Sequence, residues 1–327
     1  MSDKLSPVTN AARRRLSRIG FSFFLFFLAA YVTQIPLGAW ISAYHPGWLE
    51  APITVWLLSV VTMYCVAFPL FYLCLRPLPV GEHGNRPMRI RDLCVLFFIS
   101  FAAMYVTNLV GNAINLVTDA IFGSSSSAEA TELILESPLY LTVIFAVVIG
   151  PIVEEAMFRG ILLPRLLPFG EGFAILTSAL LFGLFHTNFE QFFYAFSIGL
   201  IFGVVMSKTG RLRYTVFLHM ALNFFGTIPS AIIMRQSERL GLTEMDEAAI
   251  LESPEAILTL LFSSGYSLLL FAFVIIGLFF LGKHLKAMRP RPAEAPIPKD
   301  ERRYLPVSVG GILYLLTLLV LFAQSYR

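Results

Sequence analysis

Long apolar segments separated by short polar connections make up most of this chain. A helix needs about 20 mostly apolar residues to cross the hydrocarbon core of a bilayer, and runs of this kind recur along the whole sequence. The fifth and sixth runs are short, and only the polar stretch 187–190 separates them, which indicates a tight hairpin or a re-entrant segment. The pattern predicts nine spanning helices, at about 21–44, 52–76, 92–120, 139–163, 172–187, 190–207, 213–233, 257–282 and 307–325.

The composition excludes a soluble globular enzyme. Hydrophobic residues make up 57% of the 327 residues, charged residues only 14%, and the mean hydropathy is +0.75. Average soluble proteins carry roughly 25% charged residues. The net charge of +3 could indicate a nucleic-acid partner, but the charges lie in short loops between apolar runs. We therefore expect contact with the lipid bilayer and no nucleic acid, and an all-α fold, a polytopic membrane helical bundle.

The distribution of Lys and Arg predicts which helix ends face the cytoplasm. Short loops on the inner side of a membrane carry an excess of these residues. With the N-terminus inside and nine alternating spans, all but three of the 24 Lys and Arg residues fall on inner segments, the exceptions being Arg235, Arg239 and Arg327. We expect the N-terminus inside and the C-terminus outside. The short loops and the bias toward Arg also favour a bacterial inner membrane.

The predicted spans divide the chain into five regions. Residues 1–20 form a basic cytoplasmic tail, and residues 21–120 contain three N-terminal transmembrane helices. Residues 139–233 form a central unit of four spans, and 234–256 form an extracytoplasmic loop. Residues 257–327 contain two C-terminal transmembrane helices joined by a Pro-rich inner linker. No internal repeat is visible, whereas many transporters are built from repeats.

Ionisable residues lie deep in only three of the predicted spans. The fourth span contains Glu154, Glu155 and Arg159, the fifth ends near His186, and the seventh contains His219. A charged side chain at the centre of a spanning helix costs roughly 2.5–3.5 kcal/mol, so such groups are candidates for function. A single histidine or a single Glu–Arg pair is more often structural. Their coincidence at these three points favours a functional site.

Helix geometry separates the two glutamates. Glu155 and Arg159 are four residues apart, about one helical turn, so they can form an ion pair. Glu154 points about 100° away and has no charged residue at the positions that could pair with it. An unpaired carboxylate in apolar surroundings suits a general base. His219 and Asn223 are again four residues apart and can face one point, so polar groups from three helices can converge.

These side chains suit hydrolysis. Glu154 would take a proton from water and His186 would orient that water. His219 and Asn223 would donate hydrogen bonds to a tetrahedral oxyanion, a contribution of about 2.7–4 kcal/mol per donor in known enzymes. No cofactor is needed for this chemistry. The alternative is a zinc site held by Glu154, His186 and His219, because two His and one Glu with an open position for water form a common catalytic set. The H-E-x-x-H helix of ordinary zinc proteases is absent from the sequence.

The same residues resemble the CPBP family of intramembrane proteases, which contains the type II CAAX prenyl endopeptidases of the Rce1 kind and the bacterial Abi proteins. The family pattern has three parts, each on its own predicted span: E-E-x-x-x-R at residues 154–159, F-x-x-x-H at 182–186 and H-x-x-x-N at 219–223. The resemblance covers roughly residues 139–230, and so identifies 139–233 as the catalytic core.

The resemblance implies a helical membrane fold with a conical cavity that opens to the inner side. It also implies cleavage of a peptide bond by a glutamate and a water, without an obligatory metal. The expected substrate is a membrane-associated peptide or protein, with or without a lipid group. By the motif match, the catalytic residues are Glu154, His186, His219 and Asn223, and the structural supports are Glu155, Arg159 and Phe182.

Three functions are compatible with this sequence. The leading prediction is an intramembrane endopeptidase. The first alternative is a catalytically silent binding or immunity protein on the same membrane fold. The second is an ion-coupled transporter that uses Glu154 and the histidines as a relay. A transporter would require polar residues along a path through both halves of the membrane, and the outer halves of the predicted spans look apolar.

Overall fold

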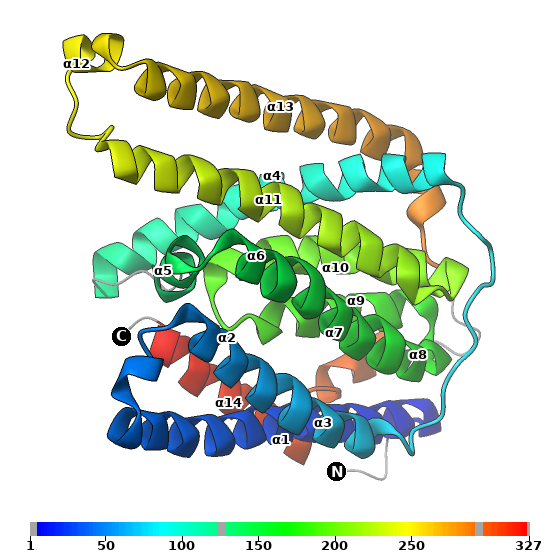
Figure 1. The fold of residues 1–327 in the computed structure, drawn as a ribbon. Helices are drawn as coiled ribbons and strands as arrows, with labels where there is room; N and C mark the ends of the chain where they lie inside the picture. Colours follow the sequence, from blue (N-terminus) through cyan, green and yellow to red (C-terminus); the bar gives the residue numbers. More distant parts are fainter. Residues whose placement is uncertain (1–4, 123–127, 292–296, 326–327) are drawn as a thin grey trace.

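The computed structural model describes residues 5–122, 128–291 and 297–325, and its regular elements there are all helices (Figure 1). The fourth span is a continuous run of short elements, α6 (Leu139–Thr142), α7 (Gly150–Glu155) and α8 (Leu163–Leu166), joined by π-helical segments. The other helices are α1 (Pro7–Tyr44), α2 (Pro52–Val60), α3 (Phe68–Leu75), α4 (Ile90–Phe122), α5 (Ala128–Glu136), α9 (Glu171–Phe185), α10 (Phe189–Thr209), α11 (Leu212–Leu240), α12 (Glu247–Glu252), α13 (Pro254–His284) and α14 (Val309–Ser325).

The predicted membrane bundle is confirmed. In the described part of the chain, seven helices are long and apolar enough to cross a membrane, and α9 and α14 are shorter apolar helices. Together they occupy the positions of the nine predicted spans. α9 ends at Phe185 and α10 begins at Phe189, so the two short spans form a tight hairpin.

Some boundaries differ from the sequence prediction. The extracytoplasmic stretch 234–256, where the mixture of charged and apolar residues favours a surface helix, contains the end of α11, up to Leu240, and α12. The fourth span runs to Phe169 as one apolar helix and does not end at 163. Its glutamates therefore lie near the middle of the helix. Residues 292–296 of the Pro-rich linker lie outside the described residues.

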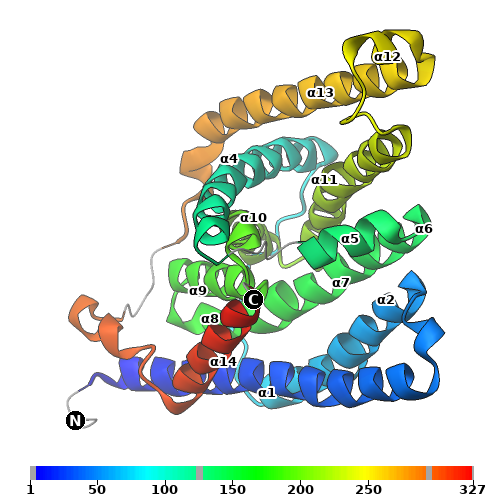
Figure 2. The same ribbon diagram turned by 90° about the vertical axis from the view of Figure 1, so that its left-hand side faces the viewer.

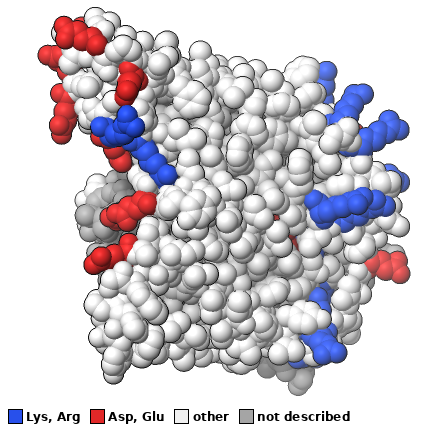
Figure 3. All heavy atoms as spheres, in the orientation of Figure 1, with Lys and Arg blue, Asp and Glu red and all other residues white. Residues whose placement is uncertain are grey.

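Charge is separated along the helix axes. Figure 3 shows that, on the visible face, Lys and Arg gather at the end where α1 begins, whereas most Asp and Glu lie at the end occupied by α12. The band between the two ends is almost free of charge on this face. This is the distribution that the positive-inside pattern predicts for a spanning bundle. The basic end is named the inner end below.

α10 lies near the centre of the bundle and packs against both α9 and α4 (Figures 1 and 2). Gly199 and Gly203 form a G-x-x-x-G pattern along its contact with α9. A β-carbon at Gly199 would lie 3.0 Å from the Cα of Ala179, and one at Gly203 would lie 3.0 Å from the Cγ2 of Ile175. In a bilayer, where apolar transfer does not drive helix association, such close backbone approach and packing hold helices together.

Three π-helical segments each end two residues before a proline. Proline has no N–H group and its ring clashes with the carbonyl four residues earlier, and a wider turn is one way to relieve that clash. Two of the segments flank the pair Glu154–Glu155, and the third carries Tyr64. The segments are Val61–Ala67 before Pro69, Val143–Ile149 before Pro151, and Ala156–Leu162 before Pro164.

Candidate active site

Glu155 and Arg159 form a fully buried ion pair. Nη1 of Arg159 lies 3.1 Å from Oε1 of Glu155, and both side chains are 0% exposed. The pairing predicted from helix geometry is therefore present. The guanidinium also lies over the rings of Phe182 and Phe202, at 4.2 and 5.4 Å from their centroids. A buried cation without a partner would be very costly, and here one carboxylate and two aromatic faces surround it.

His219 lies between the two glutamates. Its Nδ1 is 3.1 Å from Oε1 of Glu155, and its Nε2 is 3.8 Å from Oε2 of Glu154. A carboxylate only accepts hydrogen bonds, so Nδ1 donates to Glu155. The distance of 3.8 Å is too long for a hydrogen bond. Nε2 and the Glu154 carboxylate therefore face each other across a short gap without direct bonding.

Glu154 is the accessible member of the pair of glutamates. Its side chain is 19% exposed, whereas that of Glu155 is sealed from solvent. Gly150, one turn earlier, leaves room beside it: a β-carbon there would lie 3.9 Å from Oε1 of Glu154 and 3.7 Å from Oη of Tyr64. Sequence reasoning missed Tyr64, because a tyrosine in an apolar span gives no signal of its own. The only hint is Pro69, which widens the turn that carries it.

His186 caps the C-terminus of α9. Its Nδ1 lies 3.0 Å from the carbonyl oxygen of Phe182. Because a carbonyl accepts, Nδ1 carries the hydrogen and Nε2 is left as an acceptor. Glu154 and His219 are both close enough to act on His186 electrostatically. The last turn of α9 thus holds one ring nitrogen in a fixed tautomer and leaves the other for a ligand or water.

The turn after His186 is strained. Thr187 has a φ of +57°, and it is the only non-glycine residue with positive φ in the described part of the chain. A β-branched residue in this region is a genuine outlier that costs on the order of 1–3 kcal/mol. Asn188 then caps α10 by accepting from the N–H of Gln191 at 2.8 Å. The left-handed backbone at Thr187 reverses the chain within a few residues, so His186 lies in the turn between α9 and α10.

Asn223 makes a structural hydrogen bond that the sequence did not predict. Its Nδ2 donates to the carbonyl of Ala146 at 2.9 Å. In an α- or π-helix that carbonyl would accept from Gly150 or Pro151, but Gly150 donates to Phe145 and proline has no N–H. Asn223 supplies the missing donor and ties α11 to the helix of the glutamates. The other amide hydrogen is left for the predicted role toward an oxyanion.

A polar cavity of about 260 Å³ lies beside Asn223, between α4, α10 and α11. Along α11 the cavity extends from Leu222 to Thr227, near the middle of this helix. The Tyr194 ring on its wall has its centroid 6.4 Å from that of His186. The polar residues that line the cavity are Tyr105, Asn108, Tyr194, Asn223 and Thr227.

The zinc alternative involves Glu154, His186 and His219. No group of three His, Cys, Asp or Glu side chains within residues 5–122, 128–291 and 297–325 is arranged to hold a metal ion. Nδ1 of His219 donates to Glu155, and Nδ1 of His186 donates to the carbonyl of Phe182. Both hydrogen bonds leave Nε2 of each histidine free, as in histidines that bind metals, so the zinc alternative is decided by the chelator experiment described below.

Comparison with known proteins agrees with the three motifs. Residues 136–225 match the family described as type II CAAX prenyl endopeptidase Rce1-like. Among curated proteins, the chain is 27% identical over 173 residues to "Putative membrane peptidase YdiL" of Bacillus subtilis (strain 168), covering 51% of this chain and 69% of that protein. It is 29% identical over 139 residues to "Membrane-embedded CAAX protease MroQ" of Staphylococcus aureus (strain USA300), covering 40% of this chain and 55% of that protein.

No solved structure matches the chain significantly. The matched family segment contains both glutamates, Arg159, both histidines and Asn223, so it coincides with the polar cluster at the centre of the bundle. The resemblance predicted from the three motifs is thus confirmed: residues 136–225 are similar to the Rce1-like family, and the two curated relatives are named as membrane proteases.

Proposed function

We propose that this protein hydrolyses a peptide bond of a membrane-associated peptide or protein with a water activated by Glu154 and without a cofactor. The observation that supports this most directly is the asymmetric pair of glutamates on either side of His219. Glu155 is sealed and neutralised by Arg159, whereas Glu154 is partly exposed and has no direct hydrogen bond to His219. A base must reach its water, and Glu154 is the carboxylate that can.

The proposed reaction has two steps. The Glu154 carboxylate takes a proton from water while the water oxygen bonds to the peptide carbonyl carbon, which gives a tetrahedral oxyanion and a protonated Glu154. The C–N bond then breaks, and Glu154 returns the proton to the leaving amine. His186 would accept a hydrogen bond from the attacking water at Nε2, because its Nδ1 already donates to Phe182.

His219 would stabilise the oxyanion. For Nε2 to donate, both ring nitrogens must carry hydrogens, so the ring acts as a cation. Glu155 accepts from Nδ1 at 3.1 Å and supports that positive charge. Preorganised donors of this kind stabilise a transition state by about 2.7–4 kcal/mol each. Asn223 can add its second amide hydrogen from one turn farther along α11.

The substrate and the location are further parts of this proposal. One relative is named as a CAAX protease, so we propose a substrate that carries a lipid group near its C-terminus or is otherwise bound to the membrane. The basic end of the bundle supports an orientation with the N-terminus in the cytoplasm. We propose the bacterial inner membrane as the location, since both relatives are bacterial proteins.

The test is cleavage of quenched peptides, with and without a prenyl group, by the purified full-length protein in detergent. Glu154→Gln should lower the rate by at least about 100-fold, because general-base catalysis contributes about 10²–10⁴-fold. Glu255→Gln, an exposed acidic residue on α13 far along the chain from the motifs, is the matched control. The same reactions with a chelator test the metal-free mechanism.

Other outcomes would select the alternatives. Activity that is lost with a chelator and restored by zinc would contradict the glutamate–water mechanism. A folded wild-type protein that cleaves no peptide would favour a binding or immunity role. The polar cavity beside Asn223 is one segment of the path that a transporter would need. Ion uptake into liposomes that depends on Glu154, without any cleavage, would therefore favour transport.

A further inference from the structure

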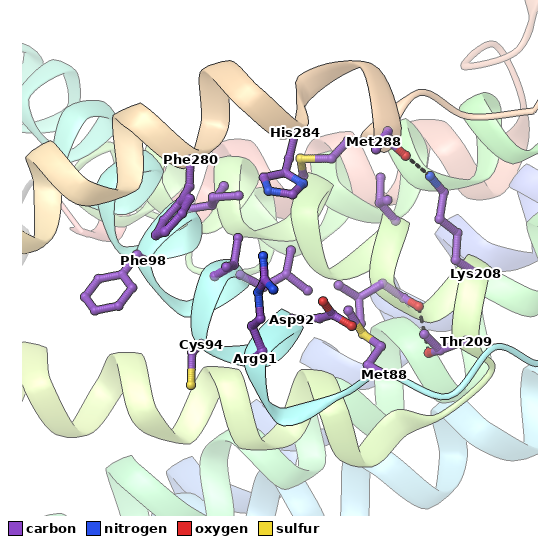
Figure 4. Close-up of a pocket in the computed structure, with 16 residues that line it drawn as sticks. Met88, Arg91, Asp92, Cys94, Phe98, Lys208, Thr209, Phe280, His284 and Met288 are labelled. Carbon is purple, nitrogen blue, oxygen red and sulfur yellow. Dashed lines mark hydrogen bonds between the residues drawn. The ribbon is translucent and has the colours of Figure 1, made fainter.

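A second large cavity lies away from the cluster of glutamates, at the inner end of the bundle between α4, α10 and α13 (Figure 4). Its volume is about 490 Å³, which is within the range of about 300–1,000 Å³ typical of small-molecule sites. None of the residues that line it belongs to the three family motifs. The cavity is therefore available for a ligand other than the peptide bond that is cleaved.

The walls of this cavity are apolar along the membrane and basic toward its inner end. Val95, Leu96, Phe98, Ile99 and Phe280 form part of the apolar wall. Phe98 and Phe280 lie together at one side in Figure 4, and the Arg91 side chain points into the space below His284. A long apolar volume that ends in positive charge matches an amphiphile with an anionic head.

The cavity borders the lipid-facing side of α13. Few of the α13 residues are buried in the bundle, and its large side chains are exposed, including Ile275 at 52% and Phe279 at 57%. In a membrane these positions contact acyl chains. Lys283, at the same end of α13, extends over the Phe279 ring at 4.1 Å, as basic side chains do when they reach from the hydrocarbon toward the headgroups.

The cations at the inner end of the cavity are not neutralised by the protein. Arg91 and Lys208 line the cavity and form no ion pair with any residue of the described ranges; Lys208 donates to the backbone carbonyl of Ala287. His284 adds a third basic group. The one acidic lining residue, Asp92, already accepts from the N–H of Arg89 at 3.2 Å.

We propose that this cavity binds an anionic phospholipid of the inner leaflet. One acyl chain would lie along the apolar wall between α4 and α13, and the phosphate would lie near Arg91 and Lys208. Basic pockets between transmembrane helices on the cytoplasmic side commonly bind anionic headgroups. By contrast, the groove of about 380 Å³ between α1 and α14 is lined by apolar, Tyr, Thr and Gln side chains and by no Lys or Arg, so it would hold acyl chains without selecting a headgroup.

The test is lipid binding to the full-length protein in detergent, followed by native mass spectrometry. The probes are phosphatidylglycerol and phosphatidylcholine with identical acyl chains. We expect the wild-type protein to prefer phosphatidylglycerol. The double variant Arg91→Gln/Lys208→Gln should bind it about 30-fold more weakly, the sum expected for two basic residues near a membrane surface.

Two further variants test whether binding depends on this cavity or only on the positive charge of the inner end in general. Arg76→Gln/Arg86→Gln removes two exposed cations from the same end of the bundle, outside the cavity lining, and should leave binding unchanged. Val204→Phe fills the cavity from α10 without changing charge and should weaken binding of phosphatidylglycerol. Circular dichroism and gel filtration of each variant show whether it is folded.

Several results would overturn the phospholipid site. Equal binding of the two lipids would show that the cations do not select the headgroup. An equal loss of binding in Arg76→Gln/Arg86→Gln would show that binding depends only on the overall surface charge. Full competition by glycerol phosphate alone would show that the apolar wall is not used. A prenylated peptide that binds here while phosphatidylglycerol does not would make the cavity part of a substrate site. Because the readout is binding, it is independent of peptidase activity.

Discussion

Nδ1 of His219 lies 3.1 Å from Oε1 of Glu155, the same oxygen that pairs with Arg159 at 3.1 Å. One buried carboxylate oxygen thus holds both an arginine on its own helix and a histidine on α11. The second glutamate, Glu154, only approaches the other ring nitrogen, with Oε2 at 3.8 Å from Nε2. Adjacent glutamates in the sequence therefore have different environments, one as an anchor and the other as an accessible base.

This asymmetry predicts that substitution of Glu155 lowers the stability of the protein, whereas substitution of Glu154 does not. Glu155→Gln should destabilise the protein by about 3–5 kcal/mol, because it leaves Arg159 as an unpaired buried cation. Glu154→Gln should leave the melting temperature nearly unchanged, since its partly exposed side chain makes no close ion pair. Thermal unfolding in one detergent measures both variants.

A matched double variant tests the cause of the Glu155 effect. Glu155→Gln/Arg159→Met removes both charges and should regain part of the lost stability. Equal melting temperatures for the two single variants, or no recovery in the double variant, would contradict the assignment of Glu155 as the anchor.

The hydrogen bond from Asn223 to Ala146 predicts coupling with Pro151. Asn223→Ala should cost about 1–3 kcal/mol, because it leaves a partly buried carbonyl without a donor. Pro151→Ala restores an N–H at the position that would reach Ala146 in the π-helical pattern. In that background, Asn223→Ala should cost less.

A double-mutant cycle on thermal or denaturant unfolding measures this coupling. Coupling of at least about 0.5 kcal/mol supports the local explanation. Additive effects of the two substitutions would mean that Asn223 stabilises the protein in some other way.

The close contact of α9 and α10 predicts that Gly199 cannot be enlarged. Its added β-carbon would meet Ala179 at 3.0 Å and Nη2 of Arg159 at 3.4 Å. Gly199→Ala should therefore destabilise the protein by about 1–3 kcal/mol, as overpacking does, and should lower activity by shifting Arg159.

Gly265 on α13 provides the matched control, because a β-carbon added there would have no neighbour within 4 Å. Gly265→Ala should be neutral or slightly stabilising, as expected for Gly to Ala within a helix. Melting temperatures of the two variants compare them directly, and similar values would argue against a tight α9–α10 contact.

The contact between Ser6 and Glu301 predicts a pH-dependent link between the N-terminus and the inner linker. The Ser6 hydroxyl donates to Glu301 Oε2 at 2.5 Å, and hydrogen bonds from Ser6 hold the pKa of Glu301 below its usual range. A depressed pKa stabilises the folded contact above the unfolded pKa of about 4.3 and loses this effect as pH falls below it.

Limited proteolysis of the linker measures that contact. Cleavage near residues 289–298 should increase as the pH falls from about 6 to below 4, with an acid-active protease chosen to cut in both conditions. Glu301→Gln should show the increased cleavage already at neutral pH and little further change on acidification. A wild-type pattern that is independent of pH would contradict the link.

Much of the fold could be predicted because it depends on local sequence. The apolar runs locate the spanning helices, because each helix must satisfy its own backbone hydrogen bonds in lipid. The pairing of Glu155 with Arg159 follows from the helical repeat alone. The prolines also determine where the helices widen, although only the structure showed that two widened segments flank the glutamates.

The sequence by itself determined which polar residues lie within the membrane and which of them share a helix face. Only the tertiary structure decided that His219 bonds to Glu155 and that Asn223 bonds to the carbonyl of Ala146. The physical reason is that spacing along a helix is a property of one segment. The rotation and depth of one helix against another depend on packing at contacts such as Gly199 with Ala179, which join residues far apart in the chain.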